Sequence, residues 1–363
     1  MNIVILHTPY LKIEMTKVMM VGSAEKSGGG VASVLKTMKR MPIWKEYNCY
    51  WLGTQIQRNY MWKLWYALRG AAITPFIIWR YDIIHFHTTP DRTGLAIQLP
   101  QLLAAKMLRR KVVVHIHMGN QLAEHTRNSF FRWWLKRADA IVLLARKWQK
   151  VFGELFPDIK TVTRVVYNAC EANGEINLQN KRNSIILMAF MSEDKGIDIM
   201  LKAWKEIHAR HPQWHVFMMG QGKVEHYRLL SEKMGLKESI TFTGYITGEE
   251  RLRMLREASI SVMCSYAEGF PMTVLEAWTY GAAVITTPVG GLPDVIEDGK
   301  NCLVTDFGNE KMLAQKLEQL MTNKTLREAM ANYSHDVMTP KFSLEAINNQ
   351  LQELYRELTK EGV

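Results

Sequence analysis

Short apolar runs rich in β-branched residues alternate with helix-length segments along the chain, and this pattern restricts the possible fold more than any other feature. Such runs are typical of strands buried on both faces, and their alternation with helices predicts a parallel, doubly wound α/β sheet. In the first half, helices are predicted over residues 94–108 and 129–137, and strands over residues 17–22, 82–86, 111–116, 140–144 and 164–166.

The same alternation repeats after a polar break at residues 168–183, which suits a linker. The 363 residues are enough for two domains, which we place at residues 1–170 and 171–342. Residues 343–363 contain a predicted amphipathic helix with Leu344, Ile347, Leu351, Leu354 and Leu358 on one face. Strands of the second sheet are predicted at residues 184–188, 215–219, 240–243, 260–264 and 283–286.

Charge is divided unevenly between the two halves. Residues 1–170 hold 25 Lys and Arg against 9 Asp and Glu, whereas residues 171–363 hold 21 against 26. The net charge of the whole chain is +11. Basic surface on the first half indicates an anionic partner, namely nucleic acid, phospholipid or an acidic substrate. No recognisable nucleic-acid-binding motif accompanies the charge, so we expect no nucleic acid.

The four cysteines are scattered without pair spacing, which suits a reducing compartment and argues against a disulfide framework or a Cys-based zinc site. The first 22 residues lack the basic region and long apolar stretch of a signal peptide. The longest apolar runs, such as residues 71–79, are too short to span a bilayer as helices. We therefore expect a cytoplasmic protein, peripherally attached to the inner face of the membrane.

Residues 265–303 carry the clearest chemistry. A predicted strand ends, a loop follows, Pro271 is suited to open a helix and Gly281 to end it. The free N–H groups at that helix start are suited to bind a diphosphate approached by Met272, Thr273 and Val274.

Two carboxylates flank this anion site. Glu268 lies in the loop before the helix and Glu276 on its second turn. Because carboxylates accept hydrogen bonds from hydroxyls, Glu276 is suited to a ribose diol and Glu268 to a transferred sugar. The alternative is an amphipathic helix with two solvated glutamates.

These residues resemble the E-x-x-x-x-x-x-x-E signature of family 4 retaining GT-B glycosyltransferases, and PVGGLPDVIEDGKNCLV resembles its continuation. The resemblance implies two facing Rossmann-like domains with an interdomain cleft, and a C-terminal helix that crosses back to the first domain. It also implies retaining transfer of a sugar from a nucleotide diphosphate to a glycan or lipid-linked acceptor, as in cell-surface polysaccharide assembly. Gly269 and Phe270 join the implied donor site.

Weaker motifs follow in the family's order. Gly28, Gly29 and Gly30 come after the first strand and open a helix, where glycines let the backbone approach phosphate, although such triplets are usually turns. Residues 194–198 resemble the family's E-K-G-x-D element, in which Lys195 would contact the diphosphate; alone, it would be ordinary solvated surface. Tyr245 and Ile246 follow a loop that resembles the one beside the nucleotide base.

Histidines mark two strand ends. His115 and His117 share one side of their strand, and the resemblance places a histidine at this strand end near the acceptor and reacting sugar; we choose His117. Packing as core histidines is the alternative, and a metal site with His85 and His87 is a third. Since the sequence has no D-x-D pair, we expect a metal-independent enzyme without a cofactor, with Lys195 and backbone donors stabilising the leaving group.

One position departs from the family. An arginine that usually precedes the E-K-G lysine by about five residues is replaced by Phe190, which removes a planar fork of donors. Either another basic residue compensates, or the enzyme is slow, or the chain is a catalytically silent GT-B protein that acts as a partner in glycan assembly.

Two N-terminal segments interleave aromatic and basic residues, which suits a membrane interface. They are residues 60–80 and 127–137. The basic excess of this half favours an anionic lipid surface. The alternative is that these aromatics belong to the core and the basic residues are solvated flanks.

Overall fold

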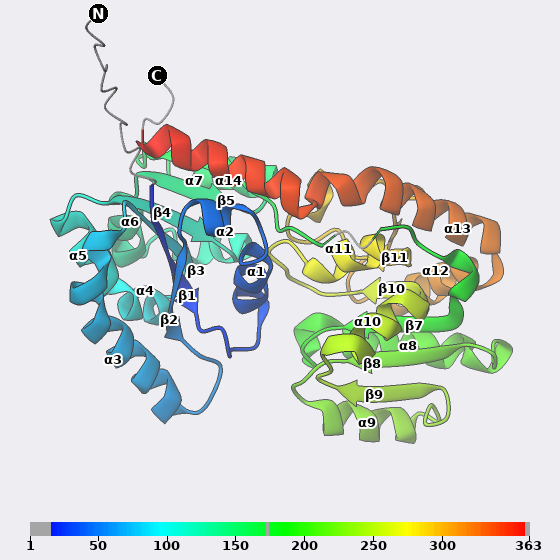
Figure 1. Ribbon diagram of the computed structural model, residues 1–363. Coiled ribbons are helices and arrows are strands. Elements are labelled where there is room, and N and C mark those ends of the chain that lie inside the picture. Colours follow the sequence, from blue (N-terminus) through cyan, green and yellow to red (C-terminus); the bar gives the residue numbers. More distant parts are fainter. Residues whose placement is uncertain (1–15, 172–173, 360–363) are drawn as a thin grey trace, which may run out of the picture.

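The computed structural model describes residues 16–171 and 174–359. The described residues form two six-stranded parallel sheets, as the α/β pattern predicts (Figure 1). The expectation about a signal peptide concerns mainly residues 1–15, which lie outside the described residues. Among the described residues, none of the helices is both long and apolar enough to cross a membrane.

The N-terminal sheet has the strand order β2-β1-β3-β4-β5-β6. Its helices are α1 (Gly30–Met38), α2 (Ile43–Glu46), α3 (Tyr60–Ile77), α4 (Arg92–Ile97), α5 (Leu99–Met107), α6 (Ser129–Leu135) and α7 (Arg146–Leu155). Its strands are β1 (Val18–Ser23), β2 (Tyr50–Gln55), β3 (Ile83–Thr88), β4 (Lys111–Ile116), β5 (Ala140–Leu143) and β6 (Val162–Val165).

The C-terminal sheet has the order β12-β11-β10-β7-β8-β9. Its strands are β7 (Arg182–Met188), β8 (His215–Met219), β9 (Ile240–Gly244), β10 (Ala258–Met263), β11 (Ala283–Thr286) and β12 (Leu303–Val304). The remaining helices are α8 (Ile197–Ile207), α9 (Val224–Lys233), α10 (Gly248–Glu257), α11 (Met272–Thr279), α12 (Glu310–Thr322), α13 (Lys324–Tyr333) and α14 (Leu344–Thr359).

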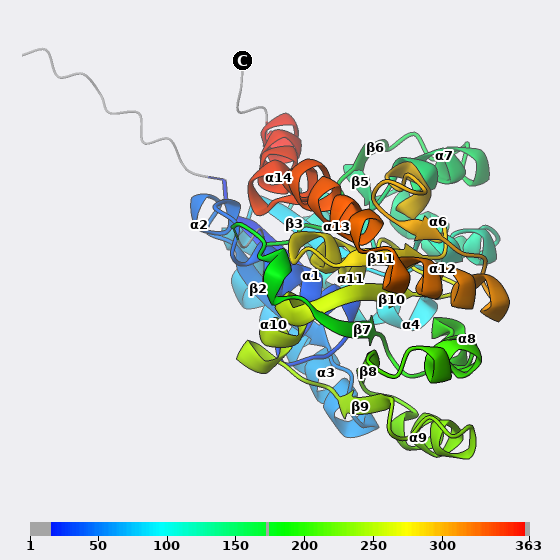
Figure 2. The same ribbon diagram turned by 90° about the vertical axis from the view of Figure 1, so that its right-hand side faces the viewer.

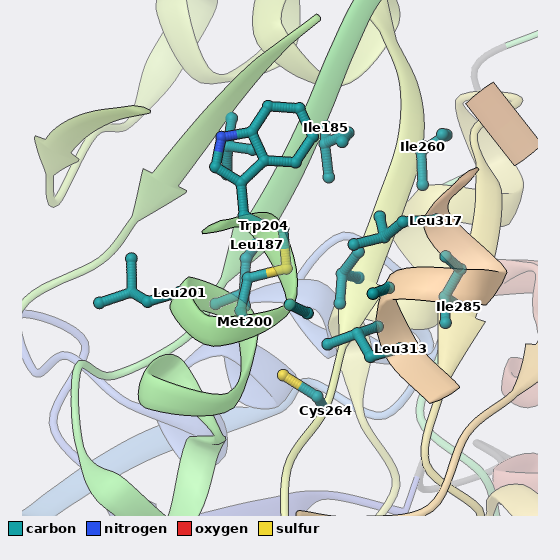
Figure 3. Close-up of a cluster of buried hydrophobic side chains, with 14 of the residues drawn as sticks. Ile185, Leu187, Met200, Leu201, Trp204, Ile260, Cys264, Ile285, Leu313 and Leu317 are labelled. Atoms are coloured by element: carbon teal, nitrogen blue, oxygen red, sulfur yellow. The ribbon is translucent and has the colours of Figure 1, made fainter. Parts of the chain in front are cut away.

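Each sheet is covered on both faces, which explains why central strands such as β1, β10 and β11 are buried along almost their whole length. One face of the C-terminal sheet packs against α8 and α12, where Trp204, Leu313 and Leu317 meet strand residues such as Ile185 (Figure 3). The indole N–H of Trp204 is not orphaned by this burial, because it donates to Ser239 Oγ at 2.9 Å.

Helix α14 returns to the N-terminal domain, as the resemblance implied (Figures 1 and 2). Its apolar stripe, including Ile347, Leu351 and Leu354, is buried against residues of β1, β3 and α1. Asn348 Oδ1 also accepts a hydrogen bond from the Ile43 backbone N–H at 2.8 Å. The last element of the chain is therefore part of the core of the first domain.

Candidate active site

The centre of the site is an ion pair between two loops of the C-terminal domain. Lys195 lies in the turn that follows β7, and Glu268 lies in the loop that follows β10. Lys195 Nζ is 2.9 Å from Glu268 Oε1 and also donates to the Ala267 carbonyl oxygen at 3.1 Å. The two side chains are 19% and 23% exposed, so the pair is screened from solvent yet reachable by a ligand.

The start of α11 lies directly beyond this pair. Pro271 occupies the N-cap position, whereas the sequence suggested that it is the first residue of the helix. Among the described side chains, none caps this helix. Met272 and Thr273 are half-buried, whereas the Val274 side chain is buried, so Val274 would contribute its backbone N–H. Free N–H groups at a helix start attract anions such as phosphate.

Glu276, on the second turn of α11, has a cationic partner that the sequence analysis missed. Arg251 Nη2, from α10, lies 2.6 Å from Glu276 Oε2. Burial lowers the pKa of the Arg251 guanidinium, but the Glu276 carboxylate produces a net rise. Nothing in the local sequence around Arg251 marks it, because α10 carries three arginines and the pairing depends on how α10 packs beside α11.

Glycines let the two domains approach each other beside the ion pair. A Cβ atom at Gly269 would lie 2.1 Å from the His117 carbonyl oxygen, so a larger residue would displace one of the two loops. The Gly269 carbonyl oxygen accepts a hydrogen bond from Trp148 Nε1 at 3.1 Å. Phe270, the next residue, is buried, and its carbonyl oxygen accepts from Asn168 Nδ2 at 2.7 Å.

The Gly28–Gly30 loop faces the C-terminal domain from the opposite side. Gly29 is the N-cap of α1 with φ of 93°, a conformation that favours glycine. The position of a Cβ atom on Gly28 lies 3.2 Å from Gln221 Nε2, which follows β8, whereas Gly30 meets open space. The N-terminal end of α1 is thus adjacent to the C-terminal domain.

His117 follows β4 at the domain boundary, but its ring is buried in a stack of four histidines. His117 Nε2 lies 2.9 Å from His87 Nδ1, and His85 Nδ1 lies 2.6 Å from the Tyr355 hydroxyl. Burial lowers the pKa of His117 to about 3, and burial also holds the pKa values of His85, His87 and His115 well below the usual histidine range. These rings are neutral at pH 7.

Three of these rings also have nitrogen atoms that lie close enough together to be candidate ligands of one metal ion. The ligand atoms of His85, His87 and His115 lie within 4.8 Å of one another. However, the ring of His85 stacks on that of His115 with an interplanar angle of 20° and on that of His87 with 22°. Because the ring lone pairs lie in the ring planes, parallel rings direct them side by side rather than toward one point. The geometry fits a packed core better than a metal centre.

The remaining predicted residues lie around the edge of the site. Phe190 is exposed beside Gly222, within the loop that follows β7. Tyr245 is exposed after β9, whereas Ile246 is half-buried and packs on a cluster that includes Met188. The structure thus brings Lys195, Glu268 and the start of α11 together, and places Tyr245 and Ile246 on a separate loop.

Asp294, in the PVGGLPD stretch that resembles the family's continuation, joins the two domains. Asp294 Oδ2 accepts from the Arg146 backbone N–H at 2.6 Å, and Asp294 also accepts from the Lys147 N–H. These are the first amides of α7, in the other domain. Tyr167 Oη donates to the same carboxylate at 3.3 Å. The motif therefore supplies an N-cap to a helix of the N-terminal domain.

Residues 171–337 match the family model described as "Glycosyl transferases group 1", and this segment contains Lys195, Glu268 and Glu276. The matched segment is less than half of the chain, and it relates the C-terminal domain to this family. The chain is 33% identical over 178 residues to the D-inositol 3-phosphate glycosyltransferase of Corynebacterium jeikeium. That alignment covers 46% of this chain and 42% of the relative, so the chain spans less than half of that protein's length.

Longer matches extend the likeness to both domains. The α-D-kanosaminyltransferase of Streptomyces kanamyceticus is 24% identical over 301 residues, covering 76% of this chain and 77% of that protein. The crystal structure of HepE from Anabaena in complex with UDP-glucose superposes with a TM-score of 0.75 at 17% identity. It covers 94% of this chain and 100% of HepE. The chain therefore has the GT-B fold.

Proposed function

We propose that this protein transfers a sugar from a nucleotide diphosphate to an acceptor with retention of anomeric configuration. The observation that carries the proposal is the Lys195–Glu268 pair beside the uncapped start of α11, with Glu276 one turn further. A nucleotide sugar would bridge these groups, because its diphosphate suits the cation and amides and its hydroxyls suit the carboxylates. HepE, crystallised with UDP-glucose, supports this class of donor.

The chain's own groups would stabilise the departing diphosphate. Lys195 and the amides of Met272, Thr273 and Val274 supply positive potential where negative charge develops. We propose that transfer needs no metal, because these donors serve the leaving group and the sequence has no D-x-D pair. No protein nucleophile is apparent in the sequence, so we favour attack of the acceptor on the same face that the phosphate leaves.

We further propose that the acceptor is a glycan or a lipid-linked molecule handled by the basic N-terminal domain in cell-surface polysaccharide assembly. The histidine stack ends with His117 at the domain boundary, next to Gly269, where an acceptor and a donor sugar would meet. A cytoplasmic protein attached peripherally to an anionic membrane would reach a lipid-linked acceptor directly.

Hydrolysis of a panel of nucleotide sugars, with and without EDTA, tests the reaction. We expect slow hydrolysis of at least one donor at the same rate in both conditions. Complete loss of hydrolysis with chelator, restored by Mg²⁺ or Mn²⁺, would contradict metal independence. Binding of a donor without hydrolysis or transfer would instead support a catalytically silent partner protein, the alternative that Phe190 favours by removing the usual arginine.

A further inference from the structure

Helix α3 exposes its large apolar side chains and buries its small ones, which is the reverse of an ordinary surface helix. Met61, Trp65 and Phe76 are 78%, 56% and 75% exposed. Together with Leu68 they recur every three to eight residues, so they form one stripe along the helix. Figure 1 shows α3 on the outer side of the N-terminal domain, away from α14.

The packed side of α3 is held by close contact and hydrogen bonds instead. Gly70 is buried, and a Cβ atom there would lie 2.9 Å from Thr54 Cγ2 on β2. Thr74 Oγ1 donates to the Gly70 carbonyl oxygen at 2.7 Å and accepts from Gln101 Nε2 at 2.9 Å. The orientation of α3 is therefore set by these inner residues, and the outward stripe is not needed to fold the domain.

Basic residues surround the exposed stripe without acidic neighbours in sequence. No Asp or Glu occurs between Glu46 and Asp82, whereas that interval contains four basic residues, namely Arg58, Lys63, Arg69 and Arg80. Arginines stack on tryptophans at both ends of the helix: the Arg58 guanidinium lies 5.6 Å from the Trp62 ring, and that of Arg80 lies 5.2 Å from the Trp79 ring.

Helix α5, which packs beside α3, extends this surface. Leu103 and Met107 on α5 and Leu108, which follows it, are exposed, and Met107 is 83% exposed. Arg109 follows directly and is exposed as well. An exposed apolar area of this kind, bordered by positive charge, marks an interaction surface.

We infer that α3, with the end of α5, lies flat on an anionic lipid surface. A helix of 18 residues is roughly 27 Å long, and its apolar stripe suits shallow insertion between headgroups. Its arginine and lysine side chains complement phospholipid phosphates, whereas a purely apolar protein partner would gain nothing from them. The inference deepens the membrane attachment proposed above and does not depend on the transfer reaction.

The second segment that the sequence suggested for membrane contact buries more of its aromatic side chains than α3 does. In α6, Phe131, Trp134 and Leu135 are buried in the core of the N-terminal domain. Lys136 pairs with Asp158 at 3.1 Å. Phe130 and Trp133 are half-buried and pack against the same core, so residues 127–137 offer less exposed aromatic surface than α3, and their membrane contact stays a prediction.

Flotation of the full chain with vesicles tests the inference. We expect the wild-type protein to bind phosphatidylglycerol-containing vesicles at least tenfold more than pure phosphatidylcholine vesicles, with less binding at high salt because the attraction is screened. Trp65→Ser with Leu68→Ser and, separately, Arg58→Glu with Lys63→Glu should each reduce binding about tenfold or more.

Two controls match these changes. Leu229→Ser removes an exposed leucine from α9 of the other domain, and Lys150→Glu with Lys160→Glu makes the same change in net charge near β6, at the opposite edge of the sheet from α3. Both should bind vesicles like the wild type. Equal binding by the α3 variants and the controls would overturn the inference.

The oligomeric state separates lipid from protein contact. If the α3 variants change the mass measured by light scattering but leave vesicle binding unaltered, the surface binds protein and the inference is wrong. Donor hydrolysis by the α3 variants should stay at the wild-type rate, since α3 lies outside the candidate active site. Absence of donor hydrolysis in every protein would reject the transfer proposal without affecting the vesicle result.

Discussion

At the scale of single residues, Arg251 changes how the donor site is understood. The sequence left open whether another basic residue compensates for Phe190, and the structure places a guanidinium 2.6 Å from the Glu276 carboxylate. Arg251 fixes one carboxylate oxygen and leaves the other for a ribose diol. It adds positive charge on the side of the site where we propose that the ribose binds, whereas Phe190 lies on the loop that follows β7.

The two glutamates should differ in their kinetic roles. Glu276→Ala should weaken nucleotide-sugar binding by about 1.5–3 kcal/mol, because a charged hydrogen-bond acceptor is lost. Glu268→Ala should mainly lower kcat, because its proposed partner is the reacting sugar. Calorimetric titration of the donor and steady-state kinetics measure the two effects. Wild-type values in both variants would reject the site.

Arg251→Met should weaken donor binding about tenfold, because Glu276 loses the group that holds it. Arg251→Lys should restore part of that affinity, since it keeps the charge but not the planar fork. Arg253→Met is the matched control, because Arg253 lies on the same helix and forms an exposed pair with Glu257. Calorimetric titration with the nucleotide sugar that the hydrolysis panel identifies as the donor tests this prediction. Identical affinities for Arg251→Met and Arg253→Met would show that Arg251 does not position Glu276.

At the scale of elements, the sequence predicted most strands because fully buried strands are continuously apolar. Strand β2 was missed since it mixes Tyr50, Gly53 and Gln55 with apolar residues, and Gly53 is required by the close approach of Ala24. The predicted helix over residues 94–108 is two helices, α4 and α5, with a break at Gln98. Pairings such as Arg251 with Glu276 could not be predicted because they depend on tertiary packing.

The histidine stack should make stability depend on pH. The folded-state pKa values lie below the unfolded value of about 6.5, so between pH 6.5 and about 3 the unfolded chain binds more protons. The buried neutral histidines therefore leave the free energy of unfolding at its full value above pH 6.5. As the pH falls below 6.5, the free energy of unfolding decreases by on the order of 1 kcal/mol per pH unit for each histidine. Urea unfolding from pH 7.5 to 5 measures the slope.

His115→Leu should reduce that slope, because it removes one of the groups that take up protons in the unfolded chain. Both ring nitrogens of His115 lack hydrogen-bond partners among the described residues, so the replacement breaks no hydrogen bond. The exposed His226→Gln variant should keep the wild-type slope. A stability that is constant over this pH range in the wild type would mean that the rings are accessible to protons.

At the scale of the whole molecule, the two domains carry different surfaces and are joined by specific contacts. The basic N-terminal domain carries the α3 surface, whereas the family match and the predicted donor residues lie mostly in the C-terminal domain. Helix α14 and the Asp294 cap cross the boundary. The resemblance to the family predicted that α14 returns to the N-terminal domain. Nothing in the sequence indicated that Asp294 contacts that domain.

Asp294→Ala should loosen the domain boundary, because the first amides of α7 lose their acceptor. Loss of an N-cap typically costs about 1 kcal/mol. Asp294→Asn should preserve most of this stability, since its side-chain oxygen still accepts from the Arg146 and Lys147 amides. Hydrogen exchange at the start of α7 should therefore accelerate in Asp294→Ala but much less in Asp294→Asn. If the two variants exchange at the same rate, the carboxylate contributes through its charge rather than as a cap.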